Sequence, residues 1–216
     1  MLKGHSYSRP PQAEKRPTLL EGDPLTGKTA PRGRAKIQLW TDGSLKEIEL
    51  IRKRKVRSAW LGGWAFILKW GPHELVKYNG VYSEGERRGL DSDRMELTAI
   101  VRGLGQIEGR HDVAVYTDSQ YAITVGRKAQ ERVNTGEHPV GGRLPNNWDL
   151  IQALCHFLKK HRVEWVYVKS HSGVEMNERA DRLAKAGAEM AEHKFLVYAP
   201  LERLVPWNYE EPISLG

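Results

Sequence analysis

The strongest constraint on the fold of this chain is a change in the spacing of its apolar residues near position 90. Before that point, three runs rich in β-branched and aromatic residues are typical of strands: KIQLWTD (36–42), GGWAFILKW (62–70) and HELVKYNGVY (73–82). A tight Gly-Pro-His connection joins the last two, which predicts a meander. From Ser92 the period becomes 3.6, and the helix should run to about Glu108 with one stripe formed by Glu96, Ile100, Leu104 and Ile107.

Strands and helices alternate through the rest of the chain. The strand-like runs are DVAVYTD (112–118) and VEWVYV (163–168), and helical patterns cover 119–130, 147–160 and about 175–193. Three strands followed by alternating helices and strands predict an α/β protein, in which helices pack on a mixed sheet.

The flanking segments differ in composition from this region. Residues 1–34 hold five prolines and few apolar residues, so we expect a flexible basic arm that buries too little surface to order itself. Residues 35–194 are expected to form one domain, since 216 residues suffice for one domain with extensions. Residues 195–216 are expected to be a C-terminal extension, whose Pro, Trp and Tyr residues suggest docking on the domain or on a partner.

The charge balance points to a polyanionic partner. Lys and Arg number 34 against 27 Asp and Glu, and the pI is near 9.5, which favours a nucleic acid as partner. The single cysteine, Cys155, excludes an internal disulfide framework and fits a reducing compartment. No apolar run approaches about 18 residues and no secretory signal is evident, so we expect a cytoplasmic protein without a membrane span.

One phosphate-binding pattern stands in the arm. GDPLTGKT (22–29) matches G-x-x-x-x-G-K-[ST] at each fixed position. A P-loop needs a buried strand before it and a helix after it, whose N–H groups converge on phosphate. Here no strand-like run precedes Gly22, Pro24 lies within the loop, and APRGRA follows in place of a helix. We interpret the match as a chance occurrence in a linker and rank nucleotide binding last among the functions considered.

Four acidic residues occupy positions where burial of a carboxylate would destabilise the fold or where ligands commonly bind. Asp42 and Asp118 each end a predicted strand, where ligands collect in α/β sheets. Glu96 lies on the apolar stripe of its helix. Asp181 shares a face with Ala184, Ala188 and Ala191. Any one of these acids alone is better explained as a helix cap or a buried ion pair.

Four such carboxylates in one place would need a cation, because like charges raise one another's pKa. An all-oxygen ligand set favours Mg²⁺ or Mn²⁺. Two such ions about 3.5–4 Å apart can hold a phosphodiester and activate water for in-line attack. If the four acids converge, the sequence predicts a metal-dependent nuclease.

Five short motifs, in order along the chain, resemble those of type 1 ribonuclease H: TDGS (41–44), RMEL (94–97), YTDSQYA (116–122), VKSHSG (168–173) and NERADRLA (177–184). The resemblance covers about residues 36–193. It implies the ribonuclease H-like fold, a five-stranded mixed sheet whose first three strands are antiparallel. It also implies an endonuclease that hydrolyses the RNA strand of RNA–DNA hybrids and leaves 3′-hydroxyl and 5′-phosphate ends.

The resemblance also assigns residues to roles. It makes Asp42, Glu96, Asp118 and Asp181 a catalytic quartet that binds two Mg²⁺ ions, with Mn²⁺ as a substitute and Asp42 as the bridge. Glu96 would also lie near the ribose 2′-hydroxyl, which distinguishes RNA from DNA. His171, in a loop containing Gly and Ser, would assist proton transfer or product release.

Substrate contacts follow from the same resemblance. It places Ser44, Gln120 and Asn147 at positions that touch the hybrid, and Arg127 and Lys128 in a basic handle between the second and third helices. We expect a monomer with an RNA–DNA hybrid as its partner. Four other histidines are expected at the surface: His5, His111, His138 and His161. Cys155 and His156 are expected at packing and surface positions, because no second pair has the spacing of a zinc site.

Three departures from the family pattern concern substrate binding. Residues 45–61 form a long basic insertion, whose RKRKVR (52–57) is either a hairpin tip that reaches phosphates or a solvated loop. Ser92 and Asp93 replace the usual pair of asparagines, and the added negative charge should weaken contact with the nucleic-acid backbone. The handle has no aromatic residue from Ala122 to Asn147, whereas the family often stacks a Trp against the DNA strand.

Two other functions stay open on the sequence alone. A catalytically silent nucleic-acid-binding module could keep the fold, but we expect such a module to lack at least one of the four acids or His171. An exonuclease or resolvase of the same broad fold would place its acids in a different order.

Overall fold

A computed structural model of the chain describes residues 37–52, 55–84, 90–136 and 145–198. The predicted arm, the P-loop-like segment 22–29 and the C-terminal extension beyond residue 198 lie outside the described residues. Within the described ranges, no helix is long and apolar enough to cross a membrane.

Five strands form one mixed sheet, as the sequence predicts. They are β1 (Ile37–Arg52), β2 (Lys55–Trp70), β3 (His73–Glu84), β4 (Asp112–Thr117) and β5 (Arg162–Tyr167). Their order in the sheet is β3-β2-β1-β4-β5. The first three strands pair antiparallel, while β4 pairs parallel with both β1 and β5. The meander therefore forms one half of the sheet and the parallel strands form the other.

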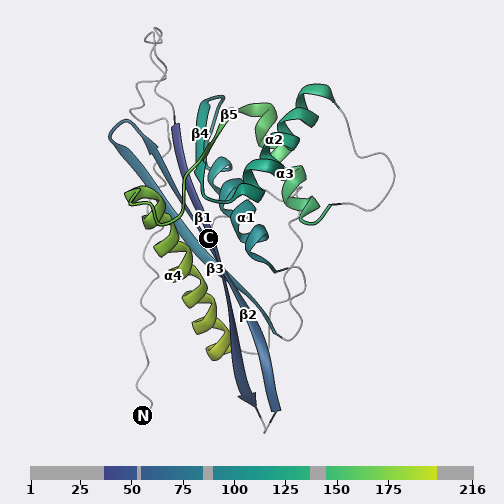
Figure 1. The fold of residues 1–216 in the computed structure, drawn as a ribbon, viewed down its shortest axis with the longest axis vertical. Helices are drawn as coiled ribbons and strands as arrows, with labels where there is room; N and C mark the ends of the chain where they lie inside the picture. The colour runs from purple at the N-terminus through teal and green to yellow at the C-terminus, as the bar shows by residue number, and fades with distance from the viewer. Residues whose placement is uncertain (1–36, 53–54, 85–89, 137–144, 199–216) are drawn as a thin grey trace, which may run out of the picture. The chain divides into compact units, whose positions relative to one another are not determined.

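Four helices cover the two faces of this sheet (Figure 1). They are α1 (Ser92–Leu104), α2 (Gln120–Thr135), α3 (Trp148–Lys160) and α4 (Glu175–Tyr198). In Figure 1, α4 lies on one side of the long strands, and the other three helices lie on the opposite side. The main core fills the space between the sheet and α1, α2 and α3, where Leu39, Phe66, Val115, Ile100 and Leu154 are buried.

The insertion that follows Asp42 is part of the sheet. β1 continues past Asp42 to Arg52 and pairs with β2 as far as Arg52↔Lys55, so the expectation that this strand ends at Asp42 is wrong. The reason is a second apolar cluster, in which Ile48 packs with Ala59 and Leu61 beneath α4. The pairing shows that β1 and β2 form a hairpin, but residues 53–54 and the side chains of 52–57 lie outside the described residues. Contact of this segment with phosphates stays a prediction.

Helix α4 is held against the sheet by direct backbone contact. A Cβ at Gly63 would overlap the carbonyl oxygen of Ala184, and one at Gly80 would overlap that of Gly187. The helix then runs beyond its expected end near residue 193, because Phe195 is buried against Tyr82 with ring centroids 5.2 Å apart. The expected start of the C-terminal extension at residue 195 therefore falls within α4.

Candidate active site

A close contact between β1 and α1 brings Asp42 and Glu96 together. Residue 43, next to Asp42, is a glycine that faces α1, and a Cβ there would overlap the Glu96 amide nitrogen and lie 2.7 Å from the Met95 carbonyl carbon. Helix α1 begins above this strand because the Asp91 side chain caps it, accepting a hydrogen bond from the Arg94 amide at 2.6 Å. Glu96 consequently projects toward Asp42 and not toward solvent.

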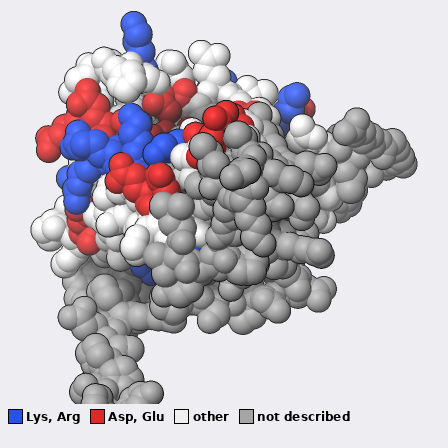
Figure 2. All heavy atoms as spheres, turned by 90° about the horizontal axis from the view of Figure 1, so that it is seen from below, with Lys and Arg blue, Asp and Glu red and all other residues white. Residues whose placement is uncertain are grey.

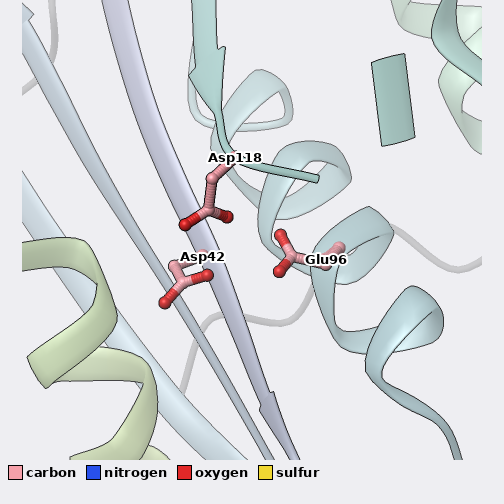
Figure 3. A group of neighbouring side chains, drawn as sticks. All are labelled: Asp42, Glu96 and Asp118. Atoms are coloured by element: carbon pink, nitrogen blue, oxygen red, sulfur yellow. The ribbon is translucent and has the colours of Figure 1, made fainter. Parts of the chain in front are cut away.

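Asp118 reaches the same place through the parallel pairing of β1 and β4. Trp40 pairs with Tyr116, so Asp42 in β1 and Asp118, directly after the last residue of β4, both lie two positions beyond this pair. One oxygen from each of Asp42, Glu96 and Asp118 lies within 4.8 Å of the others. Figure 3 shows the three carboxylates turned toward one another from β1, from α1 and from the end of β4. The predicted convergence is confirmed for these three acids.

Burial and mutual repulsion raise the pKa values of two members of this acid cluster. The pKa of Asp42 is raised from 3.8 to about 7, chiefly by burial and then by the charge of Asp118. The pKa of Glu96 is raised by burial and by the charge of Asp42. Asp42 is 5% exposed and Glu96 is 8% exposed, so water does little to relieve the repulsion.

The donor set of the acid cluster suits a divalent cation. All three residues offer carboxylate oxygens, which are the ligands that hard cations such as Mg²⁺, Mn²⁺ and Ca²⁺ prefer. The Glu96 Oε2 atom is buried and has no hydrogen-bond partner in the described part of the chain. A bound cation would satisfy that oxygen and would remove the repulsion that raises the pKa values.

Asp181 stands outside this group of three. It lies on α4, and its carboxylate Oδ2 accepts a hydrogen bond from Lys185 Nζ at 2.8 Å. Its charge nevertheless contributes to the raised pKa of Asp42, so the two carboxylates lie near each other. The sequence pattern placed Asp181 on the correct helix but gave no indication that Lys185 would neutralise it. Its place in the metal-binding quartet stays a prediction.

Asp118 has two hydrogen-bond donors that the sequence analysis missed. Ser170 Oγ donates to Asp118 Oδ2 at 2.8 Å, and Asn177 Nδ2 donates to the same oxygen at 3.2 Å. His171 follows Ser170 in the exposed loop between β5 and α4, with a left-handed backbone (φ 52°). The motif pattern located this loop, but nothing in the sequence indicated its bonds to Asp118.

The predicted substrate contacts occupy different settings. Ser44 is half-buried in β1, and Gln120, Arg127 and Lys128 are exposed on α2. Trp148 follows directly after the range Ala122 to Asn147, which has no aromatic residue. Its ring nevertheless lies beside the handle, because the Arg132 guanidinium is 5.7 Å from the ring centroid. Their contacts with a nucleic acid stay predictions.

Asn147 is already held by other side chains. Its Oδ1 accepts a hydrogen bond from Arg94 at 3.2 Å, and its Nδ2 donates to the Tyr121 hydroxyl at 3.4 Å. Arg94 also forms a two-bond ion pair with Asp149, at 3.0 and 2.5 Å. The beginnings of α1, α2 and α3 are thereby joined, so substrate contact by the Asn147 amide would require it to exchange one of these partners.

His161 is buried, although the sequence predicts a surface position. His161 is 3% exposed, so the expectation of a surface residue is wrong. The turn from α3 to β5 folds it inward beside His111, with ring centroids 6.5 Å apart. Burial and the adjacent charge of Lys160 lower its pKa from 6.5 to about 4. His156 is exposed and Cys155 is half-buried against the core, as expected; His5 and His138 lie outside the described residues.

Comparison with known proteins agrees with this arrangement. The RNase H family model matches residues 34–189. The ribonuclease H of Hahella chejuensis is 34% identical over 156 residues, which is 72% of this chain and 95% of that protein. The ribonuclease H of Erythrobacter litoralis is 35% identical over 162 residues, with 72% and 97% covered.

A ribonuclease HI of Neisseria meningitidis is 32% identical over 163 residues, covering 70% of this chain and 94% of that protein. Among solved structures, the PFV RNase H domain in solution has a TM-score of 0.49 and 17% identity, with 73% and 96% of the two chains covered. The family match spans most of the described residues, including the three converging acids, Ser170 and Asn177. The chain therefore belongs to the RNase H family.

Proposed function

We propose that this protein is an endoribonuclease that hydrolyses the RNA strand of RNA–DNA hybrids and leaves 3′-hydroxyl and 5′-phosphate ends. The observation that carries the proposal is the convergence of Asp42, Glu96 and Asp118 within 4.8 Å in a member of the RNase H family. The ribonucleases H of Hahella chejuensis and Erythrobacter litoralis are covered over 95% and 97% of their length, which supports the same activity for this domain.

The acid cluster would hold the metal ions. Asp42, Glu96 and Asp118 would provide the first ligands, and Asp181 would join them after releasing Lys185. When bound there, two Mg²⁺ ions, or Mn²⁺ in their place, would activate a water molecule and stabilise the charge of the phosphodiester under attack. Asp42 interacts with Glu96, Asp118 and Asp181, which supports its role as the bridging ligand.

The neighbouring residues would bind the hybrid and move protons. The His171 imidazole, on an exposed loop close to Asp118, would exchange a proton beside the acid cluster or assist product release. Glu96 would lie near the ribose 2′-hydroxyl. Ser44 and Gln120 would contact the hybrid near the cut, and Arg127 and Lys128 would bind its phosphates from α2.

Most of the excess positive charge of the chain lies in its N-terminal segment. On the face seen in Figure 2, Lys and Arg side chains are interspersed with Asp and Glu and form no uniform basic surface. Residues 1–36 contain eight Lys and Arg against three Asp and Glu, so this segment accounts for five of the seven excess positive charges. We expect hybrid binding to weaken steeply with salt, and removal of residues 1–34 to lower that salt dependence.

A catalytically silent binding module is the alternative, and the intact acid cluster disfavours it. A binding domain without catalytic activity would be more stable with neutral residues in place of buried acids that repel one another. A monomeric state and a cytoplasmic location stay predictions.

The proposal is tested by cleavage of a uniform RNA–DNA hybrid, compared with single-stranded RNA, duplex RNA and duplex DNA. Each substrate is incubated with Mg²⁺ or with EDTA, using the wild type, Asp42→Asn and Glu47→Gln. Glu47 is the matched control, because it is an exposed carboxylate on the same strand.

We expect metal-dependent cutting of the RNA strand of the hybrid by the wild type and Glu47→Gln, and none by Asp42→Asn. Hybrid binding without cutting of any substrate would establish the silent module. Equal activity of Asp42→Asn and the wild type would refute the role of the acid cluster.

A further inference from the structure

The loop that carries His171 is attached at both ends to one carboxylate oxygen. At its beginning Ser170 Oγ donates a hydrogen bond to Asp118 Oδ2 at 2.8 Å. At its end Asn177 Nδ2, in the first turn of α4, donates to the same oxygen at 3.2 Å. An amide NH₂ can only donate, and the Ser170 hydroxyl donates to the same oxygen, so both groups are donors here. The residues between them, including His171, span the connection from β5 to α4.

The backbone of this loop adopts conformations that need external support. His171 has φ 52° and Gly173 has φ 80°. A non-glycine residue in the left-handed region is uncommon, and it persists where the surrounding structure holds it. Ser172 Oγ donates to the Lys169 carbonyl at 2.5 Å, and the Gly173 amide donates to Glu178 Oε1 at 3.1 Å. These two bonds shape the loop internally, whereas those of Ser170 and Asn177 connect it to the acid cluster.

Asn177 makes this connection at a cost in stability. Its side chain is buried, with the residue 3% exposed, and its Oδ1 atom is buried without a hydrogen-bond partner in the described part of the chain. An unsatisfied buried oxygen destabilises a fold. Packing alone does not explain a buried amide at this position. The hydrogen bond from its Nδ2 atom, which orients Asp118, does.

We propose that Ser170 and Asn177 are positioning residues that fix the His171 loop to Asp118, so that the position of the His171 imidazole is coupled to the orientation of a carboxylate in the acid cluster. The inference rests on the proposed function, because it assumes that His171 acts beside that cluster. Coupling of this kind is reciprocal: a cation that reorients Asp118 shifts the loop, and a change in the loop alters how Asp118 meets the cation.

Ser170 is the residue to change, because it is exposed and its replacement should not prevent folding. Ser170→Ala removes the bond to Asp118, and Ser170→Thr keeps the hydroxyl. Ser172→Ala is the matched control, since it removes a hydroxyl of the same loop that bonds to the Lys169 carbonyl and not to Asp118. The full chain of each variant is labelled at its histidines, and the NMR resonances of His171 are followed in EDTA and through a Mg²⁺ titration. Hybrid cleavage is measured in parallel.

We expect the His171 imidazole of the wild type to shift on addition of Mg²⁺. In Ser170→Ala that shift should shrink and the imidazole should become more mobile, while Ser170→Thr and Ser172→Ala keep the response. The kcat of Ser170→Ala should fall about fivefold to tenfold with KM within about twofold, because a positioned proton-transfer group is loosened and no substrate contact is lost.

An unchanged His171 response in Ser170→Ala would overturn the inference, and so would a weakened response that leaves kcat unaltered. Loss of the response in Ser170→Thr as well would show that the hydroxyl is not the connection. If the wild type fails to cut the hybrid, the proposed function is refuted, while the NMR comparison still decides whether Asp118 anchors the loop.

Discussion

Gly43 lies directly beneath the backbone of Glu96. A Cβ at position 43 would overlap the Glu96 amide nitrogen and would lie 2.9 Å from Met95 Cβ, closer than side chains pack in folded proteins. The absence of a side chain at Gly43 therefore sets the distance between β1 and α1. Because Asp42 and Glu96 project from these two elements, the same contact sets the distance between their carboxylates.

Gly43→Ala should push the first turns of α1 away from β1. We expect a loss of about 1–3 kcal/mol in the free energy of unfolding and a weaker affinity for Mg²⁺, since overpacking forces the backbone to move. Chemical denaturation and a Mg²⁺ titration of hybrid cleavage measure the two effects. Gly103→Ala is the control on the same helix, where the new methyl group meets the Leu39 side chain and not the backbone near the cluster. Normal Mg²⁺ affinity in Gly43→Ala would show that this contact does not set the site.

Asp42→Asn should stabilise the metal-free protein while abolishing cleavage. Folding raises the pKa of the Asp42 carboxyl from 3.8 to about 7. The contribution of this group to the free energy of unfolding is therefore fully present below pH 3.8 and is lost as the pH rises through 7. The stabilisation by Asn, roughly 1–3 kcal/mol in EDTA, should thus be greater at pH 8 than at pH 5. Urea unfolding at both pH values measures it. Glu47→Gln, on the same strand, should change stability by less than about 0.5 kcal/mol. Destabilisation by Asn at pH 8 would contradict the repulsion.

Lys185→Gln should release Asp181 for metal binding. Lys185 holds the Asp181 carboxylate at 2.8 Å from the next turn of α4, in a half-exposed pair of the kind worth only about 0.3–0.5 kcal/mol. We expect the Mg²⁺ concentration for half-maximal cleavage to fall about twofold. Lys194→Gln, further along the same helix, controls for the lost positive charge. The same Mg²⁺ dependence in wild type and Lys185→Gln would count against Asp181 as a ligand.

Asp149→Asn should weaken the junction that joins the beginnings of α1, α2 and α3. The Arg94–Asp149 pair is partly buried, at 16% and 22% side-chain exposure, so we expect a loss of about 1–3 kcal/mol in the free energy of unfolding. Glu192→Gln breaks the exposed Lys46–Glu192 pair as a comparison and should cost at most about 1 kcal/mol. Thermal and urea unfolding of the two variants distinguish the pairs. Equal losses would mean that Arg94 and Asp149 do not connect α1 with α3.

His161→Leu should make the protein less sensitive to mild acid. The buried imidazole is neutral in the fold, and its pKa is lowered from 6.5 to about 4. Its contribution to stability is complete above pH 6.5 and is lost as the pH falls toward 4, because the unfolded chain takes up the proton first. The decrease in stability between pH 7 and pH 5 should shrink by at most about 2 kcal/mol in the variant. Urea unfolding of the metal-free protein, with exposed His193→Gln as control, tests this; an unaltered decrease would contradict it.

Local patterns in the sequence located most of the sheet and the acid cluster. A strand or helix leaves its period in consecutive residues, and for this reason β4, the start of α1 and the buried side of Glu96 could be predicted. The expected end of α1 near Glu108 is wrong, because the helix ends at Leu104 and Gly105 is its C-cap. The order of the elements predicted a mixed sheet, but only the structure showed the parallel pairing of β1 and β4 that aligns Asp118 with Asp42. The motif order also identified the family that the comparisons show.

Other features had no local signal. The extension of β1 past Asp42 depends on Phe195 and the far end of α4, which cover the hairpin from a distant part of the chain. The inward position of His161 depends on the turn between α3 and β5. The sequence around an isolated histidine in a polar segment does not indicate whether its side chain is buried or exposed.

The same division applies within the acid cluster. The sequence by itself determined which carboxylates are present and which face of each element carries them, because these are properties of neighbouring residues. Only the tertiary structure decided that Ser170 and Asn177 donate to Asp118, that Lys185 holds Asp181, and that Gly43 admits α1. Most of these contacts join segments that are more than fifty residues apart in the sequence. They depend on how backbones and side chains pack, because differences of a few tenths of an ångström decide which groups are in contact.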